Sequence, residues 1–345
     1  MTKISTQLLK WYDTHQRNLP WRAQCGHIAE PYHIWLSEIM LQQTTVAAVR
    51  SYFEKFLTKW PNIQALADAP EEDVLAAWAG LGYYARARNL IKCAKIITRD
   101  HNGIFPRNES DLKKLPGVGD YTAAAIAAIA FSRKAVVVDS NVERIVSRLV
   151  QIKTPLPAGK KDIKAATAEI TPNKRAGDFA QAMMDLGSSI CSPKAPKCHD
   201  CPLKTACGAY ATSDMENYPV KAPKKLRPTR RALVYFIEVD GYILLERRPD
   251  KGLLGGMPGL LGDEWIEQDG ETAFKYRAIN APFNAEWSLV DGTSKHTFTH
   301  FHLETKLLRA KLDARPASNH LWVPRDEVMD YGLPTVFKKM VKLII

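Results

Sequence analysis

Residues 115–131, LPGVGDYTAAAIAAIAF, place two glycines in a tight turn directly before an alanine-rich helix. Gly117 and Gly119 carry no side chain, so the backbone there can come close to a ligand. The following helix presents its free N–H groups and the positive end of its dipole at the same point. The stretch predicts a helix–hairpin–helix that binds a phosphate backbone without reading bases. The alternative is an ordinary turn between two helices, in which the same glycines also occur.

The charge of the whole chain favours a polyanionic partner. Its 345 residues hold 48 Lys and Arg against 37 Asp and Glu, a formal charge of +11 at pH 7. Such a surplus is typical of proteins that bind nucleic acid or an anionic membrane, although a protein can also simply be basic. The longest apolar run, 123–131, is about half of a membrane span. The N-terminus lacks the apolar core of a signal peptide, so we expect an intracellular, cytoplasmic protein associated with DNA.

The spacing of apolar residues predicts a mainly α-helical first domain over residues 1–209. Apolar positions three and four residues apart recur within 33–57, 71–99, 120–133, 141–150 and 162–190. A basic linker is predicted at 210–230, because KAPKKLRPTRR at 221–231 holds six basic residues, two prolines and no acid. The chain is therefore predicted to have two domains.

Strand signals predict a smaller α+β domain over residues 231–345. ALVYFIEVDGYILLERR at 232–248 is rich in β-branched and aromatic residues, and its Asp240-Gly241 pair predicts a hairpin turn. KHTFTHFHLETKLL at 295–308 alternates in the manner of one further strand. His296, His300 and His302 would then share a strand face, but the lack of a nearby acidic or Cys partner disfavours a metal site.

Two carboxylates in the first domain are candidates for chemistry. Glu38 shares a helix face with Ile34, Trp35 and Leu41, and burial there would raise its pKa toward the range of a general acid at neutral pH; a Glu reaching out from a helix edge is the alternative. Asp139 precedes a helix that Ser140 and Glu143 can cap as an S-x-x-E box. Asp139 is then not needed as the cap, which leaves it available for chemistry.

Four of the six cysteines lie within CSPKAPKCHDCPLKTAC, residues 191–207. In a reducing compartment such a group holds a metal more often than it forms disulfides. Zinc knuckles favour two C-x2-C pairs and only one is present, whereas a four-cysteine iron–sulfur cluster tolerates the C-x6-C-x2-C-x5-C spacing. Cys25 and Cys93 are predicted to be ordinary free thiols.

Taken in order, these segments resemble the iron–sulfur helix–hairpin–helix DNA glycosylases, and among them the adenine glycosylases of the MutY type. The resemblance covers nearly the whole chain and rests on SEIMLQQTTVAAV, WAGLGYYARARNL, LPGVGDYTAAAIAAIAF, VVVDSNVERI, FAQAMMDLGSSIC and the cysteine spacing. It implies two helical modules with the active site between them, double-stranded DNA as the partner and a monomeric enzyme. It also implies a [4Fe-4S] cluster held by four ligands, Cys191, Cys198, Cys201 and Cys207.

The resemblance also implies a mechanism. Glu38 would protonate N7 of an adenine flipped out of the duplex, and Asp139 would stabilise the positive sugar left behind, by electrostatics or a transient covalent bond. Asn141 and Tyr121 would orient this pair. Tyr121 stands where endonuclease III-like relatives carry a Schiff-base lysine, so we expect a monofunctional enzyme that leaves an abasic site. A bifunctional glycosylase/lyase is the rival within the fold.

Further positions match residues of the family that contact DNA. Those that wedge into the duplex and contact the base opposite adenine are Gln43, Thr44, Leu81 and Tyr83. Adjacent tyrosines on one helical turn cannot both face inward easily, so at least one of Tyr83 and Tyr84 is expected to be free to stack. Trp21 and Arg22 fit the entrance of the adenine pocket and Gln181 a place near the flipped base, although the segment 23–30 is longer than usual for the family.

The second domain resembles the Nudix fold. Hydrolysis in that fold needs a glutamate-dense REUxEE helix, and residues 262–280 contain no such cluster, so we expect binding without hydrolysis. In the family this domain recognises 8-oxoguanine through an F-S-H loop, which is present here as Phe298, Thr299 and His300. The threonine keeps the hydroxyl and adds a methyl group.

The sequence therefore predicts a base-excision-repair glycosylase that removes adenine mispaired with 8-oxoguanine, and also with guanine. A catalytically silent iron–sulfur DNA-binding protein is the rival from another class, and the presence of Glu38 and Asp139 argues against it. In the cysteine loop Lys194, Lys197 and Lys204, here named the loop lysines, are expected to face the DNA backbone.

Overall fold

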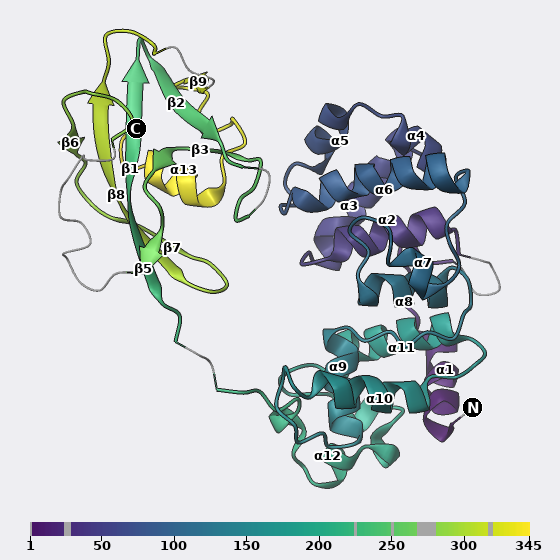
Figure 1. The fold of residues 1–345 in the computed structure, drawn as a ribbon. Coiled ribbons are helices and arrows are strands. Elements are labelled where there is room, and N and C mark those ends of the chain that lie inside the picture. Colours follow the sequence, from purple (N-terminus) through teal and green to yellow (C-terminus); the bar gives the residue numbers. More distant parts are fainter. Residues whose placement is uncertain (1, 24–28, 224–225, 250–251, 268–280, 317–319) are drawn as a thin grey trace. The chain divides into compact units, whose positions relative to one another are not determined.

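The computed structural model describes residues 2–23, 29–223, 226–249, 252–267, 281–316 and 320–345. The chain divides into two compact units, Met1–Pro223 and Lys224–Ile345 (Figure 1). Within the described residues no helix has both the length and the apolar character needed to cross a bilayer.

The first unit is helical, as the apolar spacing predicted. Its longer helices are α1 (Lys3–His15), α2 (Pro31–Leu41), α3 (Val46–Lys59), α5 (Glu71–Trp78), α6 (Ala85–His101), α8 (Asp120–Ile129), α9 (Ser140–Leu149), α10 (Lys160–Ile170) and α11 (Ala176–Ser189). Short helical turns connect them: α4 (Ile63–Ala67), α7 (Glu109–Leu112), η1 (Cys198–Asp200), η2 (Lys204–Ala206), α12 (Gly208–Ala211) and η3 (Met215–Asn217).

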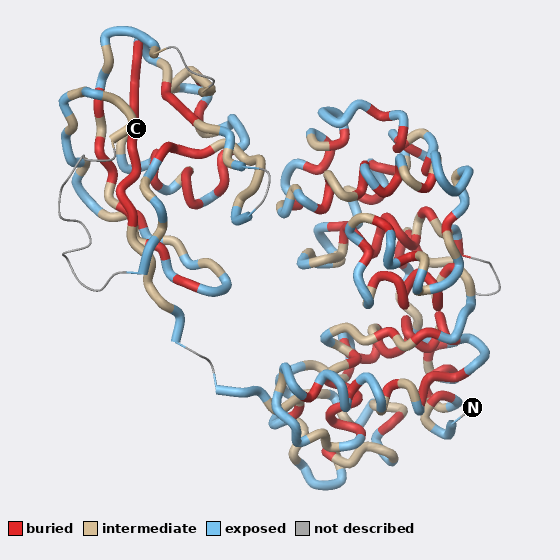
Figure 2. The backbone as a smooth tube through the Cα atoms, viewed as in Figure 1, coloured by how far each residue is buried: buried red, intermediate tan, exposed pale blue. Residues whose placement is uncertain are grey.

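The first unit has two separate hydrophobic cores, and each defines a helical module. One core is formed mainly by α2 to α8 and includes Trp35, Phe53 and Trp78. The other joins the N-terminal α1 to α9, α10 and α11. Figure 2 shows the buried segments running through both modules. Because α1 packs on α11, the N-terminal helix and the helix before the cysteine loop close the second module together.

The turn between α7 and α8 adopts the predicted hairpin. Gly117 has a φ of +78°, a left-handed conformation that glycine adopts without steric cost, and a Cβ there would lie 3.0 Å from Cβ of Asn89 on α6. Gly119 is the N-cap of α8 and no side chain caps that helix, so its first N–H groups have no side-chain acceptor. The hairpin thus presents backbone donors at the start of a buried helix.

In the part that the structure describes, the second unit is a mixed sheet with one helix packed against it. Its strands are β1 (Thr229–Val239), β2 (Tyr242–Arg247), β3 (Pro258–Gly259), β4 (Leu261–Gly262), β5 (Ile266–Glu267), β6 (Ser288–Leu289), β7 (Ser294–Thr297), β8 (His302–Lys311) and β9 (Leu321–Pro324). The main path runs β3-β2-β1-β8-β6, with β1 and β8 parallel. Alternate residues of β1 face opposite sides: Val234 and Phe236 pack with α13 (Thr335–Val341), and Tyr235 packs in a second core.

The hairpin predicted at 232–248 is confirmed. β1 and β2 are antiparallel and turn at Asp240 (φ 48°) and Gly241 (φ 75°), the two left-handed residues that a tight hairpin turn requires. The single strand predicted at 295–308 is wrong, because the chain turns back after Thr297 and β7 pairs antiparallel with β8. Alternation continues across this turn, so the pattern alone does not reveal the break.

The segment assigned to the linker is divided between the two units. Residues up to 223 pack with the first unit: the Val220 carbonyl accepts from the backbone N–H of Leu156 at 2.8 Å, and the Ala222 N–H donates to the Leu156 carbonyl at 3.3 Å. At the other end, β1 already begins at Thr229. These backbone hydrogen bonds do not depend on side-chain type, which explains why a basic, proline-containing composition does not reveal them.

Candidate active site

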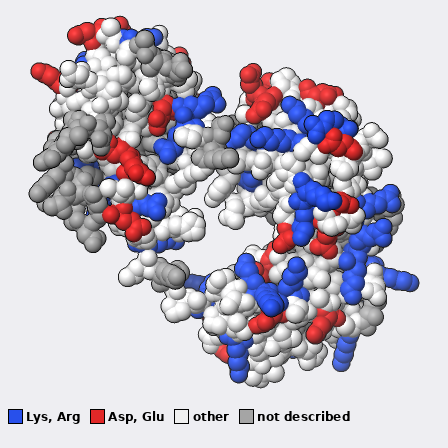
Figure 3. All heavy atoms as spheres, in the orientation of Figure 1, with Lys and Arg blue, Asp and Glu red and all other residues white. Residues whose placement is uncertain are grey.

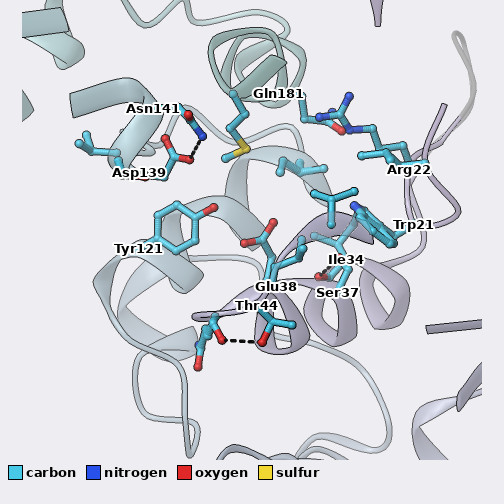
Figure 4. A pocket seen from close by; sticks show the side chains of 18 of the residues that line it. Trp21, Arg22, Ile34, Ser37, Glu38, Thr44, Tyr121, Asp139, Asn141 and Gln181 are labelled. Atoms are coloured by element: carbon cyan, nitrogen blue, oxygen red, sulfur yellow. Dashed lines mark hydrogen bonds between the residues drawn. The ribbon is translucent and has the colours of Figure 1, made fainter. Parts of the chain in front are cut away.

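A cavity of about 570 Å³ opens between the two helical modules of the first unit. Its walls come from α2 and the loop after it, from Tyr121 on α8, from the start of α9, and from Gln181 and Met184 on α11 (Figure 4). The cavity therefore receives side chains that are more than 100 positions apart along the sequence. Its size suits a flat heterocycle or a similar small organic group.

Glu38 lies at the floor of this cavity and is only 6% exposed. Burial raises its pKa from 4.5 to about 7. Hydrogen bonding from the Tyr121 hydroxyl and the charge of Arg22 lower the pKa, whereas the nearby Asp139 raises it further. Half of the Glu38 carboxyls are therefore protonated near neutral pH, which is the condition a general acid needs. The expectation of a buried carboxyl on the apolar face of α2 is confirmed.

Asp139 is the N-cap of α9, and the prediction that Ser140 caps this helix is wrong. The Asp139 backbone is extended (φ −98°, ψ −176°), and its Oδ1 accepts from the Val142 N–H at 2.8 Å. Glu143, the expected partner in the capping box, instead forms an ion pair with Lys160 at 3.0 Å. Asp139 accepts from the N–H three residues after it, as an N-cap does, so the helix is capped one residue earlier than the S-x-x-E box predicts.

As the N-cap of α9, the Asp139 side chain is held in one orientation and still faces the cavity. Its second oxygen, Oδ2, accepts from Nδ2 of Asn141 at 2.8 Å, and the carboxylate lines the cavity (Figure 4). Tyr121 lies between the two carboxyl groups, and its pKa is raised well above 10 by burial and by the charges of Glu38 and Asp139. Tyr121 is therefore a protonated hydrogen-bond donor at neutral pH. The structure brings together all four residues predicted to be catalytic.

A chain of hydrogen bonds continues from Asn141 to the cysteine loop. Nη2 of Arg144 donates to Oδ1 of Asn141 at 2.9 Å and to the Gly187 carbonyl at 2.7 Å. Nε of Arg144 donates to the Cys191 carbonyl at 2.7 Å. A Cβ on Gly187 would lie 2.5 Å from Cβ of Asn141, so only glycine permits this approach. The orientation of Asn141 thus depends on α11 and on the first cysteine.

Trp21 and Arg22 also line the cavity, as expected of residues at its entrance. Trp21 is 6% exposed and packs edge-on against Phe53. Arg22 donates two hydrogen bonds to Asp185 on α11, at 2.6 and 2.8 Å. Most of the segment 23–30, judged long for the family, and Cys25 lie outside the described residues.

Asp185 is a residue of the site that the sequence reasoning missed. It is 1% exposed and also accepts from the backbone N–H and the Nε of Arg17. The one available signal is its place in FAQAMMDLGSSIC, where an acid interrupts an apolar helix face. A buried carboxylate requires a paired cation, but the sequence does not say which one.

The predicted wedge residues lie on two loops. Gln43 and Thr44 follow α2 and line the cavity, whereas Leu81 and Tyr83 lie in residues 80–84 before α6. Leu81 is 6% exposed and Tyr83 is 65% exposed. Tyr84 packs against the first core, so of the adjacent tyrosines one faces inward and one is free, as predicted.

The four cysteines of the 191–207 loop line one small cavity together with Arg148, Tyr210 and Met215. Burial raises the pKa of Cys201 to about 11 and also raises the pKa values of Cys198 and Cys207. The neighbouring thiols raise these three pKa values further. Nη1 of Arg148 donates to Sγ of Cys191 at 3.2 Å. Across the described residues, no three His, Cys, Asp or Glu side chains are gathered closely enough to hold a metal ion.

Lys and Arg are spread over the helical unit with acidic groups between them (Figure 3), and the loop lysines are exposed.

Cys93 is a fully buried free thiol in the first core, and burial raises its pKa to about 12.

In the second unit, the predicted recognition residues form the turn between β7 and β8. Phe298 is half-buried and stacks near Trp265 and Phe301, with ring centroids 5.6 and 4.8 Å away. Thr299 and His300 are exposed at the tip of this turn. Because the turn places His296 and His302 on different strands, the assumption that the three histidines share one strand face is wrong. Residues 268–280, which belong to the stretch 262–280 where the sequence predicts no glutamate-dense magnesium-binding motif, lie outside the described residues.

Two family models match this chain. The model described as HhH-GPD superfamily base excision DNA repair protein matches residues 36–173, and the model described as NUDIX domain matches residues 232–343. The first range contains the hairpin and both cavity carboxylates, and the second contains the sheet. Fold and site together therefore define a DNA glycosylase of base excision repair.

Relatives of nearly full length narrow this class. An adenine DNA glycosylase of Buchnera aphidicola subsp. Baizongia pistaciae (strain Bp) is 32% identical over 98% of this chain and 95% of its own length. The adenine DNA glycosylase of Homo sapiens is 30% identical over 99% of this chain and 74% of its own. A solved thermostable thymine-DNA glycosylase is 30% identical, covers 61% of this chain and 95% of its own, and superposes with a TM-score of 0.55. The chain belongs to the adenine DNA glycosylase family.

Proposed function

We propose that this enzyme removes adenine mispaired with 8-oxoguanine, and with guanine, from double-stranded DNA, and leaves an abasic site. The observation that carries this proposal is the pair of carboxyl groups in the cavity, which lie in different environments. Glu38 is buried with a pKa of about 7, whereas Asp139 accepts two hydrogen bonds at a helix N-terminus. Two carboxyls with separate roles are what cleavage of a glycosidic bond requires.

Glu38 is the general acid in this proposal. Adenine is a poor leaving group, and protonation of its N7 makes departure from the sugar feasible. Tyr121 lines the same cavity, where its hydroxyl lowers the pKa of Glu38 and so opposes part of the effect of burial. Trp21, Arg22 and Gln181 form the walls around the base.

Asp139 stabilises the positive charge that develops on the sugar. Its orientation is fixed by the Val142 N–H and the Asn141 amide, so little reorganisation is needed as the charge appears. The C1′–N9 bond breaks and protonated adenine takes its electron pair. C1′ is then captured by water, which loses a proton, either directly or after a transient ester bond to Asp139 that water hydrolyses, as in glycosidases with paired carboxylates.

Release of the base without strand cleavage follows from Tyr121, because a phenol cannot form a Schiff base. Lys160 also lines the cavity, but its ammonium is paired with Glu143. We therefore expect an abasic site as the product, and borohydride should trap little covalent complex with DNA.

The four cysteines of the 191–207 loop fit a [4Fe-4S] cluster. All four thiols line one cavity, and burial together with the neighbouring thiols raises the pKa of Cys201. Four Cys thiolates are the usual ligands of such a cluster. The cluster would hold the loop in shape, with the loop lysines directed at the DNA backbone.

The base opposite adenine is contacted by both units. Gln43, Thr44, Leu81 and Tyr83 act from the first unit, by insertion and by contact with base edges. Phe298, Thr299 and His300 act from the second unit, where the exposed Thr299 hydroxyl is available to 8-oxoguanine.

The proposal is tested with duplexes carrying adenine opposite 8-oxoguanine, guanine, cytosine or thymine, assayed with and without alkali. Adenine release opposite the two purines, followed by strand breakage only after alkali, is the expected result. Equal release opposite all four bases, or breakage without alkali at the rate of base release, would contradict it.

A further inference from the structure

Arg86 is a buried arginine that none of the catalytic roles uses. It lies in the first turn of α6 and is 9% exposed. Its guanidinium donates to five oxygen atoms within 3.2 Å, which are the carbonyls of Ile39, Met40, Leu81 and Gly82 and the hydroxyl of Thr44. These acceptors belong to three segments: the end of α2, the loop after it, and residues 80–84.

The surroundings of Arg86 fix its plane as well as its position. The guanidinium lies over the rings of Trp78 and Tyr83, at 5.2 and 5.5 Å from their centroids. Trp78 is fully buried and donates its own ring N–H to the Gly82 carbonyl at 3.0 Å. Gly82 therefore accepts from two side chains that contact each other.

The positive charge of Arg86 is stabilised by the dipoles of backbone carbonyl groups. Among the described residues no carboxylate forms an ion pair with it, and burial lowers its pKa. Two of its acceptors, the Ile39 and Met40 carbonyls, lie in the last turn of α2, where the helix dipole is negative. Burying a cation whose partners are carbonyls costs free energy. An apolar residue would avoid that cost, but it could not hydrogen-bond to three segments at once as the guanidinium fork does.

The two loops that Arg86 joins have strained backbones. Gln43 (φ 59°) and Tyr83 (φ 51°) are left-handed residues other than glycine, and both are predicted to act on the duplex. Such conformations persist only where surrounding contacts over-determine them. Arg86 binds the Thr44 hydroxyl next to Gln43 and the Gly82 carbonyl next to Tyr83.

The loop after α2 has a second anchor on its other side. Nε2 of Gln42 donates to the Gly117 carbonyl at 3.4 Å and to the Thr122 hydroxyl at 3.3 Å, both at the hairpin. Residues 42–44 are therefore held between the hairpin and Arg86. Of these two anchors, only Arg86 also reaches residues 80–84.

We propose that Arg86 is a positioning residue for base extrusion, because it holds residues 42–44 and 80–84 in one fixed arrangement on the end of α2. The two loops then enter the duplex as a single rigid wedge. This inference rests on the proposed function, since it concerns how adenine leaves the stack and not how its bond is broken.

The test compares Arg86→Met and Arg86→Lys with a matched control, Arg99→Met, which makes the same change at an exposed position on α6. The single-turnover rate of adenine release is measured on an A:G duplex and on an A:G duplex whose base pairs on both sides of the mispair are also mismatched. The second substrate keeps the guanine that the loops are proposed to contact, but its adenine is already loosely stacked, so extrusion needs less wedging.

For Arg86→Met we expect a loss of about 100-fold on the A:G duplex, as for other small misplacements of a site. On the A:G duplex with mismatched neighbours the loss should shrink to less than about 10-fold. Arg86→Lys keeps the charge but not the fork and should fall between Arg86→Met and the parent enzyme. Arg99→Met should stay within about 3-fold of the parent enzyme on both substrates.

Equal loss on both substrates, or no loss on the A:G duplex, would overturn the role of Arg86. If Arg86→Met does not fold, as shown by loss of its melting transition, the same comparison is made with Arg86→Lys. Failure of the parent enzyme to release adenine from either substrate would refute the proposed function instead, so the two failures are distinguishable.

Discussion

Replacing Glu38 with glutamine should abolish adenine release and stabilise the folded protein at alkaline pH. A glutamine at this position would keep nearly the same volume in the buried site but has no proton to give. Loss of a general acid lowers rates by about 10²- to 10⁴-fold. For the parent enzyme, the rate should fall as the pH rises through about 7, because the protonated fraction of Glu38 then declines.

The size of the stability change follows from the pKa of Glu38. Burial raises this pKa from 4.5 to about 7, so the stability conferred by the protonated carboxyl is fully present below pH 4.5 and is lost as the pH rises through about 7. At pH 8 the ionised group costs about 3 kcal/mol, which glutamine avoids. At about 2–4 °C per kcal/mol for a unit of this size, the melting temperature of Glu38→Gln should exceed that of the parent by up to about 10 °C.

The assay measures adenine release and the melting transition in the same buffers from pH 5 to pH 8.5. Glu54→Gln on α3, which is exposed, serves as the control and should change neither quantity. Two results would refute the reasoning: a Glu38→Gln enzyme that stays active, or a difference in melting temperature that does not grow between pH 5 and pH 8.5.

Three further predictions concern the carboxylate behind the cavity wall and the cysteine loop. Asp185→Asn should destabilise the protein by about 3–5 kcal/mol in chemical denaturation and lower adenine release, because it removes the buried carboxylate that pairs with Arg22; unchanged stability would count against that pairing. Cys201→Ser should reduce the iron content below the four atoms per chain expected of the parent, measured by iron analysis of protein purified without air; a zinc-filled, fully active parent enzyme would contradict the cluster assignment. Charge reversal of the loop lysines to Glu should weaken DNA binding, and the plot of log affinity against log salt should become shallower by about 0.9 for each phosphate that is no longer neutralised; an unchanged slope would place these lysines away from the DNA.

The parts of the site that follow local patterns were predictable from the sequence. Gly117 needs a left-handed backbone before α8, and this requirement is visible in the residues themselves. Glu38 lies on the apolar face of α2, so its burial follows from the 3.6-residue period. The conformation of Gly117 and the burial of Glu38 both depend on residues within one or two helical turns along the sequence.

Features decided by competition or by distant contacts were not predictable. Asp139 and Ser140 are both good N-caps, and which of them caps α9 depends on where the backbone leaves its extended conformation. Arg86 looks like part of a basic helix face in WAGLGYYARARNL, and its burial comes from α2, about 45 residues away in sequence. Asp185 is similar, since its partners Arg17 and Arg22 lie at the opposite end of the first unit in sequence.

Helix α11 places a mechanical limit on the enzyme. It contributes Ala180 to the first core and Met183 to the second, and through Asp185 it also holds Arg22 at the cavity wall. One continuous helix embedded in both modules resists any hinge between them, so the cavity cannot widen to admit a base that is still stacked. The deformation must be made by the duplex, and adenines beside easily unstacked pyrimidine–purine steps should leave fastest.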